Sequence, residues 1–131
     1  MHRLEGAAGA LPPRIRVLLL TARSRVELAQ GLIGPARDTV RDAMAAAVAI
    51  GDRPTVAGVA EAAAELELAA GDRDAAARTL GLAAAVRGAL DQGSPDVRAV
   101  VRTVDPAALA KASTVDPEEA LAELSSYARR R

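Results

Sequence analysis

The sequence contains no cysteine, phenylalanine or tryptophan, and only one tyrosine, one histidine and one lysine. The absence of cysteine excludes disulfides, thiolate nucleophiles and cysteine-ligated metal sites. The one histidine, His2, belongs to the N-terminal tail, so a histidine-based triad or zinc site would require that tail to fold back. The one lysine, Lys111, does not follow a glycine-rich phosphate-binding loop. We therefore expect no enzymatic activity, no metal and no cofactor.

The sequence also lacks an excess of charge of either sign and any long apolar run. Its 17 basic and 17 acidic residues give a formal net charge of zero, which argues against direct nucleic-acid binding. No apolar run approaches the roughly 20 residues of a membrane helix, and residues 1–13 lack a secretory signal. We expect a cytoplasmic protein with no membrane association. The wealth of arginine and alanine is typical of a GC-rich, for example actinobacterial, genome.

What the sequence does contain is alanine, at 33 of its 131 residues. Alanine has the highest helix propensity, and its small side chain permits close packing of helices. Because the aromatic residues that favour β-sandwiches are almost missing, the composition predicts an all-α fold.

One stretch of the chain recurs after forty residues. Residues 26–31 read Val-Glu-Leu-Ala-Gln-Gly, and residues 66–71 read Leu-Glu-Leu-Ala-Ala-Gly. A fixed period of this size is the signature of stacked supersecondary units. The most informative matched pairs are Glu27/Glu67, Leu28/Leu68, Gly31/Gly71 and Thr39/Thr79. The repeat predicts two copies of one helical hairpin.

Glycine, proline and aspartate divide the chain into a flexible tail, residues 1–12, and a single helical domain, residues 13–131. The predicted units are hairpins at 13–50 and 54–91 and a C-terminal helical cap at 94–129. The predicted helices are 13–30, 35–50, 54–70, 74–91, 95–103, 106–112 and 117–129. We expect the last helix to lie over the end of the second hairpin.

Helical periodicity assigns a core face to each hairpin helix. The predicted core residues are Ile15, Leu19, Ala22, Val26 and Ala29, then Ala36, Val40, Ala43 and Ala47, then Val59, Ala63, Leu66 and Ala70, and finally Ala76, Leu80 and Ala83. Leu18, Leu19 and Leu20 are consecutive and point about 100° apart, so at least one of them should face an outer surface. This favours a homodimer or an upstream domain as a neighbour of the first helix.

The hairpins resemble the tetratricopeptide repeat. Its order of glycine, alanine, large apolar residue and alanine is matched by Gly31, Ala36, Val40 and Ala43, and again by Gly71, Ala76, Leu80 and Ala83. The period is longer than the usual ~34 residues, and the first-helix signature residues are replaced by Ala60, Ala63, Ala64 and Glu67. The resemblance implies an α-α superhelix whose first helices line a concave groove for peptides.

Residues 50–124 also resemble the C-terminal helical region of actinobacterial SARP and LuxR-type transcriptional regulators that carry an ATPase module. The likeness rests on the order of the segments 50–52, 60–72, 76–87 and 118–121. Residues 94–115 are shorter than the corresponding part of that family and lack its aromatic residues. The resemblance implies a region for signal sensing or protein contacts, with transcriptional regulation as its context.

The groove face provides the candidate site. If the core stripe of the third helix points inward, Glu61, Glu65 and Leu68 share another face at helical spacing. Their counterparts in the first hairpin are Leu18, Thr21, Arg25 and Leu28. Either this face binds a peptide, or the final helix or a second chain covers it.

We therefore expect a protein-interaction or regulatory helical-repeat module with a protein or peptide partner. A small-ligand sensor, in which the hairpins enclose an effector, and a standalone homodimeric adaptor remain the alternatives.

Overall fold

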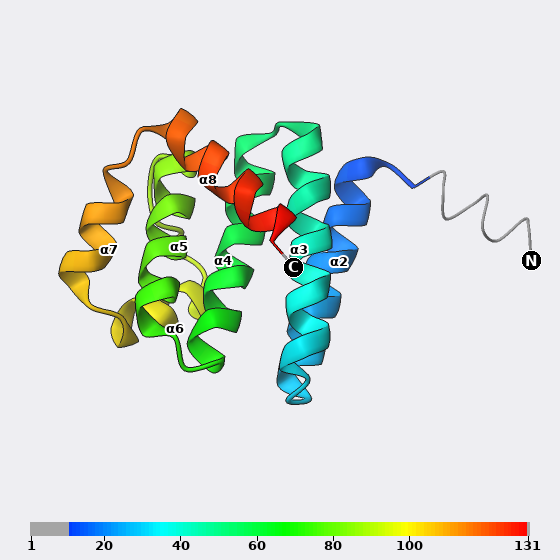
Figure 1. The fold of residues 1–131 in the computed structure, drawn as a ribbon, viewed down its shortest axis with the longest axis horizontal. Helices are drawn as coiled ribbons and strands as arrows, with labels where there is room; N and C mark the ends of the chain where they lie inside the picture. The colour runs from blue at the N-terminus through cyan, green and yellow to red at the C-terminus, as the bar shows by residue number, and fades with distance from the viewer. Residues whose placement is uncertain (1–10, 131) are drawn as a thin grey trace, which may run out of the picture.

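The computed structural model describes residues 11–130, and these residues form helices without any strand (Figure 1). The helices are α2 (Pro13–Ala29), α3 (Ile33–Ile50), α4 (Arg53–Ala69), α5 (Arg73–Arg87), α6 (Pro95–Thr103), α7 (Pro106–Ser113) and α8 (Pro117–Arg129). The all-α prediction is confirmed. The predicted tail up to residue 10, His2 and Arg131 lie outside the described residues. None of the helices within residues 11–130 has the length and apolarity to cross a membrane.

Capping side chains start five of the helices at the predicted residue or one residue before it. Each cap accepts a hydrogen bond from a backbone N–H of the first turn, which would otherwise lack a partner. The five caps are Asp52, Asp72, Ser94, Asp105 and Asp116. Helix α5 ends at Arg87, short of the predicted residue 91, because Gly88 adopts a left-handed conformation with φ of 101°.

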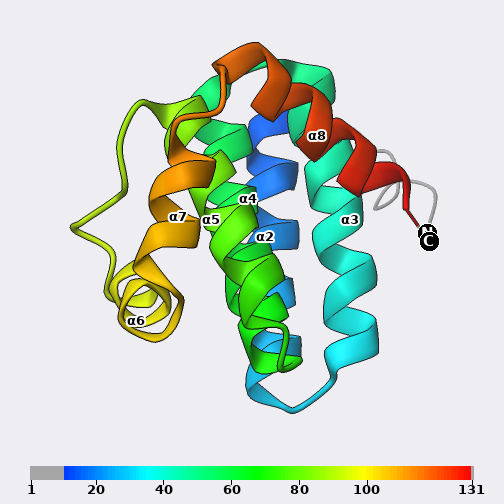
Figure 2. The same ribbon diagram turned by 60° about the vertical axis from the view of Figure 1, so that its left-hand side comes forward.

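The helices form two hairpins, α2–α3 and α4–α5, which stack side by side (Figures 1 and 2). Helix α4 packs against both helices of the first hairpin. Helices α6 and α7 cover the far side of the second hairpin, where α7 packs on α5. Helix α8 contacts α5, as expected, but it also contacts α3. It therefore bridges both hairpins and does not simply cap the second one.

Two ion pairs join α8 to the second hairpin. Arg53 Nη2 lies 2.8 Å from Glu118 Oε1, and Arg78 Nη2 lies 2.6 Å from Glu123 Oε1. Near the end of α8, the ring of Tyr127 is buried beneath two guanidinium groups, and burial raises its pKa to about 12. The chain's one tyrosine thus anchors the last helix.

The buried apolar residues form two clusters. We call core 1 the cluster that joins α2, α3, α4, α5 and α8, and core 2 the cluster that joins α4 and α5 to α6 and α7. The predicted core faces of α3 and α5 are confirmed, since every residue assigned to them is buried. In α4, Val59, Ala63 and Leu66 are buried, whereas Ala70 is exposed beyond the helix end.

The predicted core face of α2 is wrong. Ile15, Leu19, Ala22, Val26 and Ala29 are all exposed. The buried face of α2 consists of Val17, Thr21 and Ser24, with Leu20 and Leu28 packed partly against core 1. The two buried hydroxyls donate to the backbone carbonyls of Val17 and Thr21, so their burial leaves no unpaired donor. Periodicity selects the more apolar face, and here that face points away from the core.

The contact between α5 and α7 depends on the absence of a side chain at Gly81. A Cβ at this position would collide with the side chain and backbone of Ala112. Gly58 in α4 is also helical, but a Cβ there would meet nothing within 4 Å. Gly81 is therefore needed for packing, and Gly58 is not.

This difference gives a matched pair of substitutions. Gly58→Ala should raise the free energy of unfolding by about 0.5–1 kcal/mol, because alanine has the higher helix propensity. Gly81→Ala gains the same propensity but overpacks the α5–α7 contact at a cost of about 1–3 kcal/mol, so its net effect should be destabilising. Urea unfolding followed by circular dichroism measures both. Equal stabilisation by the two changes would contradict the close α5–α7 contact.

Candidate binding pocket

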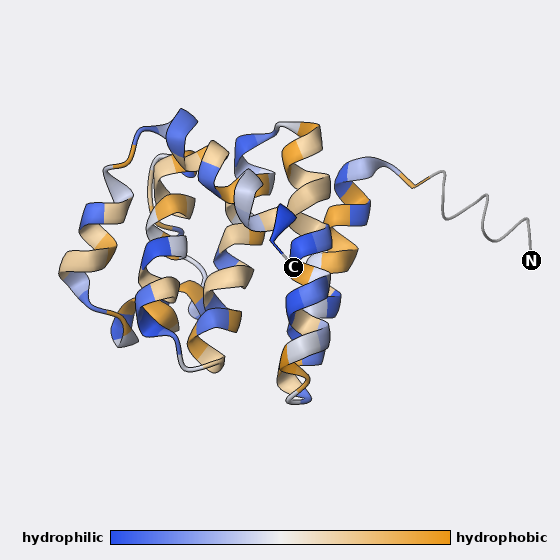
Figure 3. Ribbon diagram, in the orientation of Figure 1, coloured by the Kyte–Doolittle hydropathy of each residue, from blue (hydrophilic) through white to orange (hydrophobic). Residues whose placement is uncertain are grey.

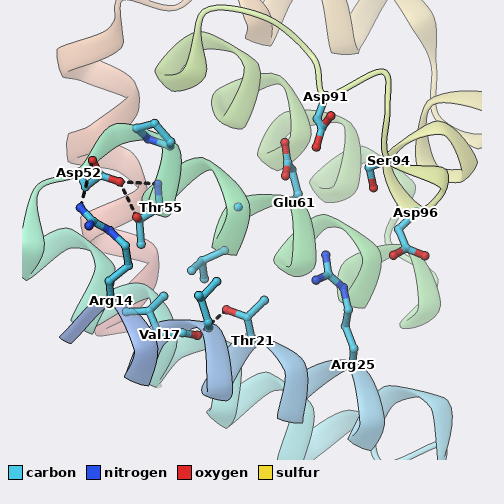
Figure 4. A pocket seen from close by; sticks show the side chains of 14 residues that line it. Arg14, Val17, Thr21, Arg25, Asp52, Thr55, Glu61, Asp91, Ser94 and Asp96 are labelled. Atoms are coloured by element: carbon cyan, nitrogen blue, oxygen red, sulfur yellow. Dashed lines mark hydrogen bonds and ion pairs between the residues drawn. The ribbon is translucent and has the colours of Figure 1, made fainter. Parts of the chain in front are cut away.

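A concave pocket of about 450 Å³ lies between α2, α4 and the segment that leads into α6 (Figure 4). It is the place where the two repeats and the C-terminal helices meet. Its walls come from residues 14–25 of α2, residues 52–61 around the first half of α4, and residues 91–96. Asp52 and Ser94 hold this framework as caps of α4 and α6.

The base of the pocket is apolar. Val17 from α2 and Val59 from α4 are each 1% exposed, and both line it. Leu18 stands at the rim with 58% of its surface exposed. Gly58 adds no side chain and leaves the space above it open. An apolar side chain of a ligand would therefore find contacts on several sides.

A buried carboxylate lies in one wall. Glu61 is 6% exposed, and both of its carboxylate oxygens accept hydrogen bonds from Arg87 Nη2 at 2.9 Å. Burial raises the pKa of Glu61, and the attraction of Arg87 lowers it by less. Desolvation thus exceeds the effect of the ion pair, and the folded protein binds a proton at Glu61 more readily than the unfolded chain does.

An ion pair in the repeat register joins α2 and α4. Arg25 Nη2 lies 2.7 Å from Glu65 Oε2, and the two residues are forty positions apart. Helices at equivalent positions of the two repeats therefore lie side by side here. The hydrogen bond to Glu65 raises the pKa of Arg25, which stays charged. The guanidinium points into the pocket, toward the side where Glu61 and Asp96 lie (Figure 4).

The remaining charges leave the pocket acidic. Arg14 pairs with Asp52 at 3.5 Å. Arg25 pairs with Glu65 and Glu61 pairs with Arg87, and these two partners do not line the pocket. Asp91 and Asp96 also line the pocket, and within residues 11–130 their carboxylates make no hydrogen bond or ion pair, although Asp96 lies near enough to Arg25 to help raise the pKa of that guanidinium. Two carboxylates are thus available above an apolar base.

Four of the seven predicted site residues line this pocket, namely Leu18, Thr21, Arg25 and Glu61. Glu65 lies outside it but holds Arg25 in place. Leu28 and Leu68 lie outside this pocket, and they pack partly against core 1 and core 2, respectively. They are half-buried supports of the fold.

Sequence reasoning misses the part of the pocket contributed by residues 91–96. The Ser94-Pro95 pair correctly marks a helix start, and Asp96 follows in the first turn. Nothing in the local sequence indicates that this start lies beside α2, because that depends on how α6 packs on the second hairpin. Arg14 is missed for a related reason, since its partner Asp52 is 38 positions away.

In comparisons with known proteins, the chain matches no family model, no curated protein and no solved structure.

The raised pKa of Glu61 predicts a pH-dependent effect of Glu61→Gln. As the pH rises from about the ordinary glutamate value of 4.5 through the raised folded value, the wild-type protein loses stability at this group, because the folded state must release a proton that it binds more tightly. Glutamine does not titrate. The free energy of unfolding of Glu61→Gln minus that of wild type should therefore become more positive as the pH rises from about 4.5 through the raised folded pKa.

Urea unfolding at a series of pH values measures this difference. The ion pair with Arg87 has the opposite effect on this difference. It stabilises the wild-type protein more as Glu61 ionises, and the glutamine variant lacks it. A difference that becomes more negative with pH would show that the ion pair exceeds desolvation, contrary to the account of this wall.

Proposed function

We propose that the chain is a tetratricopeptide-like interaction module that binds a short protein segment in the pocket between α2, α4 and α6, without catalysing a reaction. The observation that carries the proposal is the combination of an apolar base with the free carboxylates of Asp91 and Asp96. The segment should carry a lysine or arginine next to an apolar side chain. The same pocket contains the greater part of the face that the repeat singles out.

Each part of such a segment has a matching contact. A cationic side chain would lie near Asp91 and Asp96, where charge-assisted hydrogen bonds are stronger than neutral ones. An apolar side chain would pack against Val17, Leu18 and Val59 and would supply most of the affinity, as buried anchors do in peptide recognition. Arg25 would repel a second positive charge on its side or donate hydrogen bonds to a carboxylate or carbonyl oxygen of the ligand, which fixes the direction of binding.

The resemblance to the C-terminal region of SARP and LuxR-type regulators supports the same class of function. In those proteins the helical region mediates signal sensing or protein contacts. We infer a regulatory context in the cytoplasm, with a protein partner and not nucleic acid as the ligand of this domain. The balanced charge supports that choice.

A small-ligand sensor is the second candidate, and the size of the pocket favours it. A volume of about 450 Å³ lies in the range of small-molecule sites, roughly 300–1,000 Å³. The ligand would be an organic cation with an apolar part, because it would meet the same groups. A rise in melting temperature with such a cation, in the absence of any peptide binding, would favour this candidate.

Peptide binding is tested with two matched pairs of variants. The probe is a fluorescent library of short peptides in which one lysine or arginine adjoins one leucine, and anisotropy gives the affinity. Leu18→Ser should weaken binding, whereas Leu19→Ser should not, although the two leucines are 58% and 55% exposed. Asp96→Asn should weaken binding about three- to tenfold, or ~0.7–1.4 kcal/mol, whereas Asp74→Asn, also in a first helical turn, should not.

Salt and charge provide the control for this experiment. The effect of Asp96→Asn should shrink at high ionic strength, because the carboxylate is solvent-exposed. If peptides with glutamate in place of the basic residue bind equally well, or if Leu19→Ser weakens binding as much as Leu18→Ser, the pocket is not the binding site.

A further inference from the structure

The exposed large apolar side chains of residues 11–130 are all found on α2 or next to its ends. They are Leu11, Ile15, Leu18, Leu19, Val26 and Leu32, each 38–58% exposed. Leu18 belongs to the pocket. Ile15, Leu19 and Val26, together with the small Ala22, form one stripe at helical spacing, which we call the outer α2 face. Helix α2 lies at one end of the stack, and Figure 3 shows hydrophobic residues along it.

The repeat shows what this face does in the second hairpin. Forty residues after Leu19, Ala22 and Val26 come Val59, Ala62 and Leu66, which are 1%, 3% and 2% exposed. Val59 and Leu66 belong to core 1, which joins α4 to the preceding hairpin, and α4 packs against both α2 and α3. The positions of Leu19 and Val26, which are exposed in α2, are therefore positions that α4 buries in core 1, whereas the counterpart of Ile15 is the half-buried Thr55.

We propose that the outer α2 face is a stacking surface for one further helical hairpin of the same repeat type, which would pack on α2 as α3 and α2 pack on α4. The stripe has the composition that this interface has in α4, with a small alanine between two large apolar residues. Stacked repeats bury such faces against their neighbours, and a terminal repeat without a neighbour normally has a polar outer face. The outer α2 face is apolar, as an internal repeat's face would be.

A second copy of the chain fits this face less well. Because exposed large apolar residues are confined to α2 and its ends among the described residues, two copies would have to pair α2 with α2. Helix α2 contains four arginines, of which Arg14, Arg23 and Arg25 each form an ion pair with an acidic residue, which leaves Arg16 beside the stripe as the uncompensated charge. Two copies of the face would bring two Arg16 charges to one interface, with no uncompensated acidic residue of α2 to offset them. The added hairpin would contact α2 through a helix equivalent to α3. Helix α3 carries arginine and aspartate in equal number, so it brings no excess positive charge to the interface.

The test adds the missing neighbour to the full chain. Residues 13–52 are duplicated in front of Pro13, so that Asp52 of the added copy precedes Pro13 much as Asp52 precedes Arg53 in the natural chain. Val26→Cys in the original α2 provides the only thiol, because the chain has no cysteine. Maleimide labelling of this introduced thiol should be slowed about tenfold or more by the added hairpin, and the melting temperature should rise. Labelling of the Ala110→Cys variant, whose thiol lies at an exposed position on α7, should stay the same in both proteins.

Two results would overturn the proposal. Equal labelling of the Val26→Cys thiol with and without the added hairpin, at an unchanged melting temperature, would show that the face does not accept a repeat. The second result concerns the chain without the added hairpin. If labelling of its Val26→Cys thiol slows as the protein concentration rises, and sedimentation shows dimers, a second copy covers the face. As a control, a second version of the extended protein carries Leu19→Arg and Val26→Arg in the added copy. Its outermost helix is then polar, so aggregation does not obscure the result.

Discussion

The close approach of helices with small side chains is the constraint on which this structure depends. Core 1 and core 2 contain many alanines and only one aromatic residue, Tyr127. Each buried methyl group contributes little, on the order of 0.8 kcal/mol, so stability requires many such contacts at short distance. Ala63 and Ala76 are completely buried, and at Gly81 even a Cβ is too large. Close approach leaves little freedom for sliding, which holds the helices in one register.

That register creates both surfaces to which we assign binding. Side-by-side placement of α2 and α4 brings Arg25 opposite Glu65, and Asp91 of the segment before α6 and Asp96 in its first turn then close one side of the pocket. The same placement leaves the outer face of α2 without a neighbour among the described helices. The pocket and the stacking surface lie on different faces of one helix.

Local signals in the sequence predict the fold well, because helix starts, helix ends and the repeat are encoded within a few residues. Asp52, Asp72 and Asp116 cap the helices that follow them, and Gly31 and Gly71 end helices with positive φ. The errors concern tertiary packing. Periodicity assigns the apolar stripe of α2 to the core because it cannot show which face has a neighbour. The role of residues 91–96 depends on the position of α6, which no local pattern encodes.

The central claim, that α2 and α4 lie side by side in the forty-residue register, is tested most directly by exchanging the charges of Arg25 and Glu65. Arg25→Glu alone and Glu65→Arg alone each place like charges together and should lower the free energy of unfolding. The double variant restores an ion pair across the same two helices, so its loss should be clearly smaller than the sum of the two single losses, with a coupling of about 0.5–1 kcal/mol or more. A double variant whose loss equals that sum would show that the two side chains do not meet, and the register would be wrong.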